Sequence, residues 1–295
     1  MLDLESIPVP KPGKGELLVK VAAAGVNPVD FKIRAGKYPA VEQDKLAFIM
    51  GRDVAGTVVE VGGSGSRFAT GDAVIAMPGI GRGGYAEYAV VKVTEAAKKP
   101  ESLDVVEAGA VPLAALTAWQ GLFTHGHLKS GQRLLVQGGS GGVGHFAIQF
   151  AKAKGAHVIT TASAAHIDFL RRLGADQVID YEAQRFEEIV AEADVVFDLI
   201  GGEVQERSWQ VLKKGGVLVS TLNEPSKEKA AAAGTRGMRY TVTESGEDLR
   251  AIIELIDAGQ VKPVVTKTYQ LGEAAAAQQF LEHEHPAGKV VLSIN

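Results

Sequence analysis

Apolar and polar positions follow two different patterns along this chain of 295 residues. In the first 100 residues, short apolar runs alternate with turns that contain glycine, and no long run has helical spacing. The apolar runs lie at residues 16–26, 53–61, 71–76 and 85–91. Such short strands separated by glycine turns predict a β-rich domain, either a small barrel or a sandwich.

Beyond Pro100 the pattern changes to alternating strands and helices. Helical spacing begins at residues 106–123, where Pro112 is expected to break or kink the helix. Parallel strands joined by helices predict a doubly wound domain of the dinucleotide-binding type. Its strands are predicted at residues 134–136, 157–161, 177–180, 193–198, 216–221 and 238–243.

The turn after the first of these strands carries the clearest chemical signal. It consists of Gly138, Gly139, Ser140, Gly141, Gly142, Val143 and Gly144. Glycines at its first, fourth and seventh places leave room for a diphosphate against the backbone. The apolar face that begins at Val143 predicts a helix, and the N-terminus of a helix attracts an anion. These seven residues are therefore predicted to bind a dinucleotide cofactor.

The same turn also satisfies a second motif, because residues 138–142 read G-x-S-x-G, the strand–turn–helix elbow of serine hydrolases. In that alternative Ser140 is the nucleophile, with Asp198 and His283 as its partners. Gly144 is expected only of a dinucleotide turn, and no HGGG-like segment precedes the motif, so the dinucleotide interpretation is favoured. A third alternative, a cofactor-binding sensor or structural protein without turnover, stays open.

Two segments near the end of the chain do not continue the alternation. They are an amphipathic helix expected at residues 247–258 and a strand at residues 288–294. We interpret them as a return to the first domain, which is then discontinuous. The predicted division assigns residues 1–108 and 244–295 to the β-rich domain and residues 109–243 to the dinucleotide-binding domain, because 295 residues exceed one ordinary core.

Composition excludes several classes of function. The net charge of −4 arises from 35 acidic and 31 basic residues dispersed along the chain, so binding to nucleic acid or to an anionic membrane is not expected. The absence of cysteine excludes disulfides, thiolate zinc sites and cysteine nucleophiles. No apolar run approaches about 20 residues, and the start lacks a signal-peptide pattern. We therefore expect a cytoplasmic protein.

The expected cofactor is NADP(H). An NAD site usually carries Asp or Glu at the end of the second strand, where the carboxylate binds the ribose 2′-hydroxyl. This chain has Thr-Ala-Ser-Ala there, at residues 161–164, so no carboxylate repels a 2′-phosphate and the hydroxyl of Ser163 can bind it. His166 and Tyr181 can add hydrogen bonds to the same group.

Eight motifs, in order, resemble the zinc-independent quinone oxidoreductase branch of the medium-chain dehydrogenase/reductases. They are GVNPVDFKIRAGKYP, GRDVAGTVVEVG, FATGDAVIAM, GGYAEYAVV, AVPLAALTAWQGL, QGGSGGVGHFAIQFAK, LGADQVIDY and GKVVL. The resemblance covers essentially the whole chain and implies an α/β fold, in which a GroES-like catalytic domain is interrupted by a Rossmann domain. It also implies NADPH-dependent hydride transfer to quinones or to the C=C bond of α,β-unsaturated carbonyls. Because members of that branch carry a further strand before the position of Leu2, we expect the first residues to be missing here.

The resemblance assigns roles to several residues. Asn27 and Arg52 stand where the zinc branch of the superfamily carries Cys and His, and amide and guanidinium groups are poor zinc ligands, so no metal is expected. Asn27 and Asp30 are expected to shape the nicotinamide end of the site. Thr117 is expected to hydrogen-bond the nicotinamide ribose or carboxamide. Arg52 is expected beside the substrate, and Asn223 beside cofactor and substrate.

The resemblance also suggests a proton donor and an assembly. Enoyl-thioester reductases of a neighbouring branch carry a catalytic tyrosine just beyond an N-P-x-D motif, and Tyr38 stands at the matching place; the alternative is that water delivers the proton. The strand at residues 238–243 is expected at a sheet edge, where a homodimer would form as in relatives. The His-Glu-His triplet at residues 283–285, and likewise His125 and His127, are interpreted as ordinary loop residues.

Overall fold

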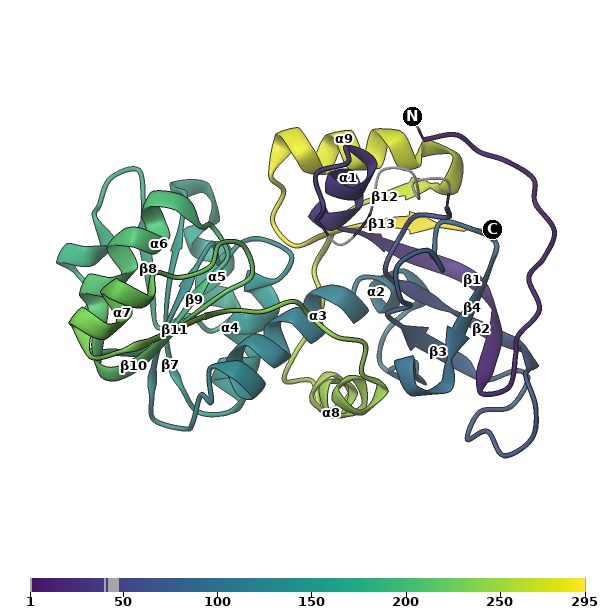
Figure 1. The fold of residues 1–295 in the computed structure, drawn as a ribbon, viewed down its shortest axis with the longest axis horizontal. Helices are drawn as coiled ribbons and strands as arrows, with labels where there is room; N and C mark the ends of the chain where they lie inside the picture. The colour runs from purple at the N-terminus through teal and green to yellow at the C-terminus, as the bar shows by residue number, and fades with distance from the viewer. Residues whose placement is uncertain (1, 40, 42–47, 295) are drawn as a thin grey trace. The chain divides into compact units, whose positions relative to one another are not determined.

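The computed structural model describes residues 2–39, 41 and 48–294, and the chain forms two compact units. Unit 1 comprises Met1–Leu116, Thr243–Gly259 and Pro263–Asn295, and unit 2 comprises Thr117–Val242 and Gln260–Lys262. Unit 1 thus collects both ends of the chain, coloured purple and yellow in Figure 1. The boundaries between the units fall at 116/117 and 242/243, with residues 260–262 in unit 2, where the sequence predicts 108/109 and 243/244. Within the described residues, no helix has the length and apolar character needed to span a membrane.

Unit 1 is built on a β-sheet, as its short apolar runs predict. Six strands follow the order β12-β13-β1-β2-β3-β5, and β4 pairs with β1. Their bounds are β1 (Glu16–Val26), β2 (Val54–Val61), β3 (Ala73–Ala76), β4 (Tyr88–Lys92), β5 (Ala96–Lys98), β12 (Val265–Gln270) and β13 (Lys289–Ser293). Because β13 pairs antiparallel with β1, the end of the chain closes onto its beginning.

The helices of unit 1 are short, apart from α8 and α9. Their bounds are α1 (Pro28–Arg34), α2 (Val105–Gly109), α8 (Gly246–Asp257) and α9 (Ala274–Glu284). Helix α9, which lies beside α1 in Figure 1, was not predicted, because its run of alanine and glutamine has a weak apolar pattern. The loop predicted at residues 283–285 is therefore wrong for His283 and Glu284, which end α9.

Unit 2 is a parallel sheet in the order β11-β10-β9-β6-β7-β8. Counted along the chain this is the order 6-5-4-1-2-3, which is that of the dinucleotide-binding fold, so the predicted Rossmann domain is confirmed. The strands are β6 (Arg133–Gln137), β7 (His157–Ala162), β8 (Gln177–Asp180), β9 (Ala193–Asp198), β10 (Leu212–Ser220) and β11 (Arg236–Arg239).

Helices surround this sheet in Figure 1. They are α4 (Gly144–Ala153), α5 (Ile167–Arg172), α6 (Gly202–Ser208) and α7 (Lys227–Ala233), while α3 (Pro112–Trp119) leads into the unit. Pro112 begins α3 and does not kink a longer helix, because proline fits the first turn. The strand predicted at residues 238–243 is wrong from Tyr240 onward: β11 ends at Arg239, and Tyr240 is buried with its hydroxyl donating to the carbonyl of Thr117.

Candidate cofactor and catalytic site

The glycine turn joins β6 to α4 inside unit 2. Gly138 has a φ of 83°, in the left-handed region, and its N–H donates to the hydroxyl of Thr161 on the neighbouring strand β7. The N–H of Gly139 donates to the carbonyl of Thr161 at 3.2 Å. The start of the turn is therefore fixed against the carboxyl end of β7, next to the point where the strand order reverses between β6 and β9.

Two glycines of the turn are required by close packing. A Cβ added to Gly144 would lie 2.3 Å from the carbonyl oxygen of Gly138 and 2.7 Å from the Cα of Gly139. A Cβ added to Gly139 would lie 2.0 Å from the hydroxyl oxygen of Thr160. Because glycine has no Cβ, the first turn of α4 can lie this close to the residues that follow β6. At Gly141 an added Cβ would lie 3.7 Å from the carbonyl oxygen of Gly138, which is an ordinary contact. The turn itself therefore has space for a side chain at this position.

The middle of the turn is open enough for a ligand. Residues 140–143 are only half-buried, whereas α4 is buried from Gly144 onward. Val143 precedes the helix and makes no side-chain cap hydrogen bond. Backbone N–H groups at the start of a helix favour an anion, so these residues fit the diphosphate of a dinucleotide cofactor.

The predicted 2′-phosphate residues lie at the same edge of the sheet. Ala162 pairs with Asp180 across β7 and β8, so Ser163 and Tyr181 follow paired positions on neighbouring strands. The Ser163 hydroxyl lies 3.4 Å from Nδ1 of His166, and Tyr181 is 59% exposed. The arrangement offers a hydroxyl, an imidazole and a phenol to one ligand.

Asp198 and Asn223 organise a loop of unit 2. The carboxylate of Asp198 accepts hydrogen bonds from the N–H groups of Ile200 and Gly201 and from the side chains of Gln205 and Ser220. In unit 1, Nδ1 of His283 lies 2.9 Å from the carbonyl oxygen of Gln279 in its own helix. Asn223 accepts a hydrogen bond from the N–H of Gly202.

In unit 1, a buried polar cluster surrounds Asn27. Its side-chain NH₂ donates to Oδ2 of Asp53 at 2.8 Å and to the carbonyl of Gly25 at 3.3 Å. Its oxygen accepts a hydrogen bond from the ammonium of Lys289. Asn27, Asp53 and Lys289 are 1%, 0% and 2% exposed, so Asn27 lies inside the unit and not on a surface open to solvent.

Asp30 lies three residues further, in α1, and is fully buried. Its Oδ2 accepts hydrogen bonds from the backbone N–H of Asn27 at 2.8 Å and from the hydroxyl of Tyr85 at 2.9 Å. Burial raises the pKa of Asp30 to about 7, although these two hydrogen bonds act in the opposite direction. Oδ1 of Asp30 is buried without a hydrogen-bond partner in the described part of the chain.

The remaining predicted residues differ in their surroundings. Arg52 is buried, donating to the carbonyl of Pro78 at 3.0 Å and to Glu244 at 2.6 Å. Tyr38 is partly buried and packs against the apolar core of unit 1. Thr117 is 6% exposed in unit 2, where its carbonyl accepts the hydroxyl of Tyr240. The structure thus brings Asn27 and Asp30 together, and separately the glycine turn with Ser163 and Tyr181.

Sequence reasoning missed Tyr85, Asp53 and Lys289 as members of the Asn27 cluster. Lys289 stands 262 positions from Asn27, so no local pattern joins them. The signal in the sequence is that they stand in GRDVAG, GGYAEY and GKVVL, three of the motifs that carry the family resemblance.

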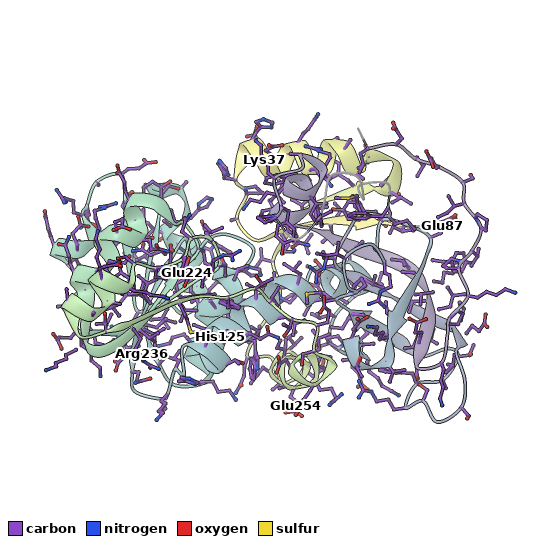
Figure 2. The ribbon with its side chains drawn as sticks, in the orientation of Figure 1. Lys37, Glu87, His125, Glu224, Arg236 and Glu254 are labelled. Carbon is purple, nitrogen blue, oxygen red and sulfur yellow. The ribbon has the colours of Figure 1, made fainter. Side chains whose placement is uncertain are left out.

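Histidine does not form a metal site in the described part of the chain. Among those residues, no three or more His, Cys, Asp or Glu side chains are placed to hold a metal ion. His125, labelled in Figure 2, ends the π-helical turn Gln120–His125, so the loop predicted there is wrong for this residue. Its ring lies 4.5 Å from that of Tyr240, and burial lowers its pKa.

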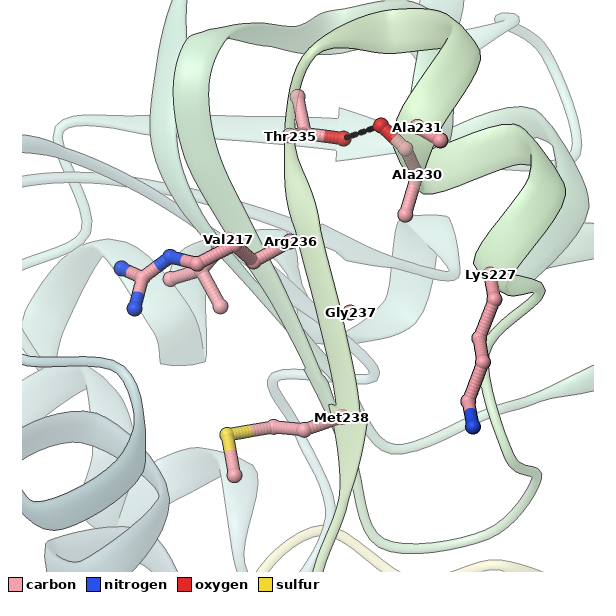
Figure 3. A pocket seen from close by; sticks show the side chains of 8 residues that line it. All are labelled: Val217, Lys227, Ala230, Ala231, Thr235, Arg236, Gly237 and Met238. Atoms are coloured by element: carbon pink, nitrogen blue, oxygen red, sulfur yellow. Dashed lines mark hydrogen bonds between the residues drawn. The ribbon is translucent and has the colours of Figure 1, made fainter.

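One pocket of unit 2 lies away from the glycine turn. It has a volume of about 450 Å³ and is lined by Val217, Lys227, Ala230, Ala231, Thr235, Arg236, Gly237 and Met238. Val217 of β10 pairs with Arg236, the first residue of β11, whereas the glycine turn follows the carboxyl end of β6. Figure 3 shows Arg236 and Met238 extending to one side of β11 and Lys227 lying on the other.

Two family models match the chain. An alcohol dehydrogenase GroES-like domain matches residues 13–101, and a zinc-binding dehydrogenase model matches residues 173–292. The NADPH-dependent alkenal/one oxidoreductase of Arabidopsis thaliana chloroplasts is 38% identical over 99% of this chain and 76% of its own length.

Solved structures resemble the whole chain. The quinone oxidoreductase from Coxiella burnetii has a TM-score of 0.90 and 34% identity, covering 98% of this chain and 93% of its own. A mycobacterial protein solved in complex with NADPH has a TM-score of 0.87 and 31% identity, covering 98% and 94%.

Proposed function

Since the chain belongs to the medium-chain dehydrogenase/reductase superfamily, with quinone oxidoreductases and enone reductases among its relatives, we propose that it is an NADPH-dependent oxidoreductase. Its acceptor is a quinone or the C=C bond of an α,β-unsaturated carbonyl, and the reaction needs no zinc. The observation that carries the proposal is the glycine turn, where Gly144 lies against Gly138 and Gly139 and residues 140–143 stay accessible.

The residues of unit 2 would bind and orient the cofactor. The N–H groups of residues 140–144 would hold its diphosphate, and Ser163 and Tyr181 would hydrogen-bond its 2′-phosphate. Thr117 and Asn223 would supply further hydrogen bonds to it. When bound, NADPH supplies the hydride. The absence of Asp or Glu at the end of β7 supports NADPH over NADH.

The acceptor gains a hydride at one atom and a proton at another. For an enone, hydride forms a C–H bond at the β-carbon, the π electrons move towards the carbonyl, and the α-carbon then takes a proton. For a quinone, the hydride supplies both electrons and one hydrogen, and the oxyanion of the reduced ring takes the proton, which gives the hydroquinone. Tyr38 is the proposed proton donor, with water as the alternative. Arg52 borders the substrate, although Glu244 and Pro78 already hold part of its guanidinium.

Zinc independence rests on the donor atoms. Asn27 and Arg52 take the places of zinc ligands, and the surroundings of Asn27 contain an ammonium, which repels a divalent cation. Elemental analysis is expected to find no stoichiometric zinc. Activity lost to a chelator and restored by zinc would contradict this part of the proposal.

NADPH consumption against a panel of quinones, alkenals and enones tests the function. Turnover of at least one class is expected. Tight NADPH binding without any turnover would support the sensor alternative. Labelling of Ser140 by a fluorophosphonate, together with the absence of NADPH binding, would support the hydrolase alternative.

A further inference from the structure

The ammonium of Lys289 is enclosed by oxygen atoms inside unit 1. It donates to the side-chain oxygen of Asn27 and lies 3.4 Å from both the carbonyl of Val26 and Oδ2 of Asp53. Lys289 begins β13 and is 2% exposed. A buried ammonium is costly unless it is paired and hydrogen-bonded, and here Asp53 supplies the opposite charge.

The surrounding backbone leaves space for this arrangement. A Cβ added to Gly25 would lie 2.2 Å from Oδ2 of Asp53, so only glycine fits there. The other oxygen of Asp53 accepts the N–H of Leu113 at 2.5 Å. The carboxylate is therefore held from both sides and cannot turn away from Asn27 without losing a hydrogen bond.

The orientation of the Asn27 amide follows from these partners. Its oxygen faces the ammonium, and its two N–H groups face Asp53 and Gly25. A flipped amide would direct N–H groups at Lys289 and an oxygen at a carboxylate, which is unfavourable at both ends. With both N–H groups used and 1% of Asn27 exposed, Asn27 is not a donor to an acceptor carbonyl.

Asn27 also starts α1. Its backbone N–H donates to Asp30, and the N–H of Asp30 donates to the carbonyl of Asn27. Helix α1 ends at Arg34, four residues before Tyr38. The side chain of Asn27 thus joins the Lys289–Asp53 pair to the segment that carries the proposed proton donor.

We propose that Lys289 is a positioning residue for the reduction: paired with Asp53, it holds the Asn27 amide in one orientation and thereby fixes α1 and the segment leading to Tyr38. The inference rests on the proposed function. In the absence of the ammonium, the Asn27 oxygen loses its donor and Asp53 loses the opposite charge beside it. The same change raises the pKa of Asp30, whose carboxyl is hydrogen-bonded by Asn27 and Tyr85, because the charge of Lys289 lowers that pKa in the parent protein.

The test uses Lys289→Met, the double variant Lys289→Met/Asp53→Asn, and Lys98→Met as a control, since the side chain of Lys98 is 69% exposed and pairs with Asp72 on the surface. In Lys289→Met, we expect kcat with an enone to fall at least tenfold, the Kd for NADPH to stay within twofold, and the ionisation of Asp30 in the pH–rate profile to move to higher pH. In the double variant this ionisation is expected to return towards its parental pH while kcat stays low, because the charge of Asp53 that raises the pKa of Asp30 is removed as well, whereas the amide orientation is not restored.

Two results would overturn the inference. One is a Lys289→Met variant with kcat within twofold of the parent and an unchanged pH profile. The other is a double variant that regains the parental kcat, because the pair would then only balance charge. If Lys289→Met does not fold, the double variant still decides, since it removes both buried charges together. A parent protein that binds NADPH but reduces no acceptor would refute the proposed function itself, before any variant is compared.

Discussion

The hydroxyl of Tyr85 donates a 2.9 Å hydrogen bond to the carboxylate of Asp30, and both side chains are buried in unit 1. Desolvation by burial raises the pKa of Asp30 to about 7, and the nearby charge of Asp53 adds to this rise. The hydrogen bonds from Asn27 and Tyr85 and the charge of Lys289 lower it. The pKa of Tyr85 is also raised, chiefly by burial and then by Asp30.

This pair predicts a pH dependence of stability. The pKa of Asp30 is 3.8 when unperturbed and about 7 in the fold, so between these values the folded state binds more protons than the unfolded chain. The free energy of unfolding therefore falls from about pH 4 to about pH 7, by roughly 4 kcal/mol at most, and then levels off.

Tyr85→Phe tests this relationship. Loss of a hydrogen bond to a charged carboxylate, about 1.5–3 kcal/mol, raises the pKa of Asp30 by a further one to two units. Urea unfolding at pH 5 should change little, whereas at pH 9 the variant should be less stable than the parent by about that energy. Tyr88→Phe, at a half-buried position of β4, is the control. Equal losses at both pH values would contradict the assignment.

Gly144→Val should abolish tight binding of NADPH. The new side chain would collide with the backbone of Gly138 and Gly139, so overpacking should cost at least about 1–3 kcal/mol of stability. Gly141→Ala separates the loss of NADPH binding from the loss of stability, because the added Cβ fits the turn but would lie against a diphosphate. We expect this second variant to keep its stability and lose affinity. Gly272→Ala, with nothing within 4 Å of the added Cβ, controls for glycine replacement. A stable Gly144→Val protein with parental affinity would show that the site is elsewhere.

Ser163→Asp should shift the preference from NADPH towards NADH. One or two hydrogen bonds to the 2′-phosphate are worth about 1–3 kcal/mol, or about tenfold to a hundredfold in affinity. A carboxylate at the end of β7 would repel the phosphate and accept from a ribose hydroxyl. Dissociation constants for both cofactors measure this, with Ser163→Asn as the uncharged control. Equal constants for NADPH and NADH in the parent would refute the preference.

Tyr38→Phe separates the two proton donors. If the phenol is the acid, enone turnover should fall at least tenfold while NADPH affinity is unchanged, because general acids typically contribute about 10²–10⁴-fold. Quinone reduction should suffer less, because water readily protonates the reduced oxyanion. Tyr269→Phe, on β12, is the control. Unchanged enone turnover would leave water as the donor.

The protein is expected to be a homodimer through β11. This strand ends the sheet of unit 2, and an edge strand favours pairing with a second copy across a two-fold axis. Light scattering at micromolar concentration should give twice the mass of one chain. Met238→Glu, which places a charge on the edge strand, should shift the protein towards the monomer. A monomeric parent would contradict this expectation.

Much of the fold could be predicted because it is encoded locally. The apolar runs of β6, β7, β9 and β10 and the glycines after β6 act over a few residues, and period and turn chemistry are readable at that range. Helix α9 and the end of β11 could not be predicted. In the first the apolar stripe is weak, and in the second burial of Tyr240 overrides a strand-like pattern.

The sequence by itself determined the two-part organisation, the place of the cofactor turn and the absence of cysteine ligands, since each follows from residues that are close neighbours in the chain. Only the tertiary structure decided the state of Asn27. Its partners Asp53 and Lys289 lie 26 and 262 positions away, and they meet because β13 pairs with β1. Burial then determines which groups are charged and which N–H groups are already used, and neither can be read from residue type alone.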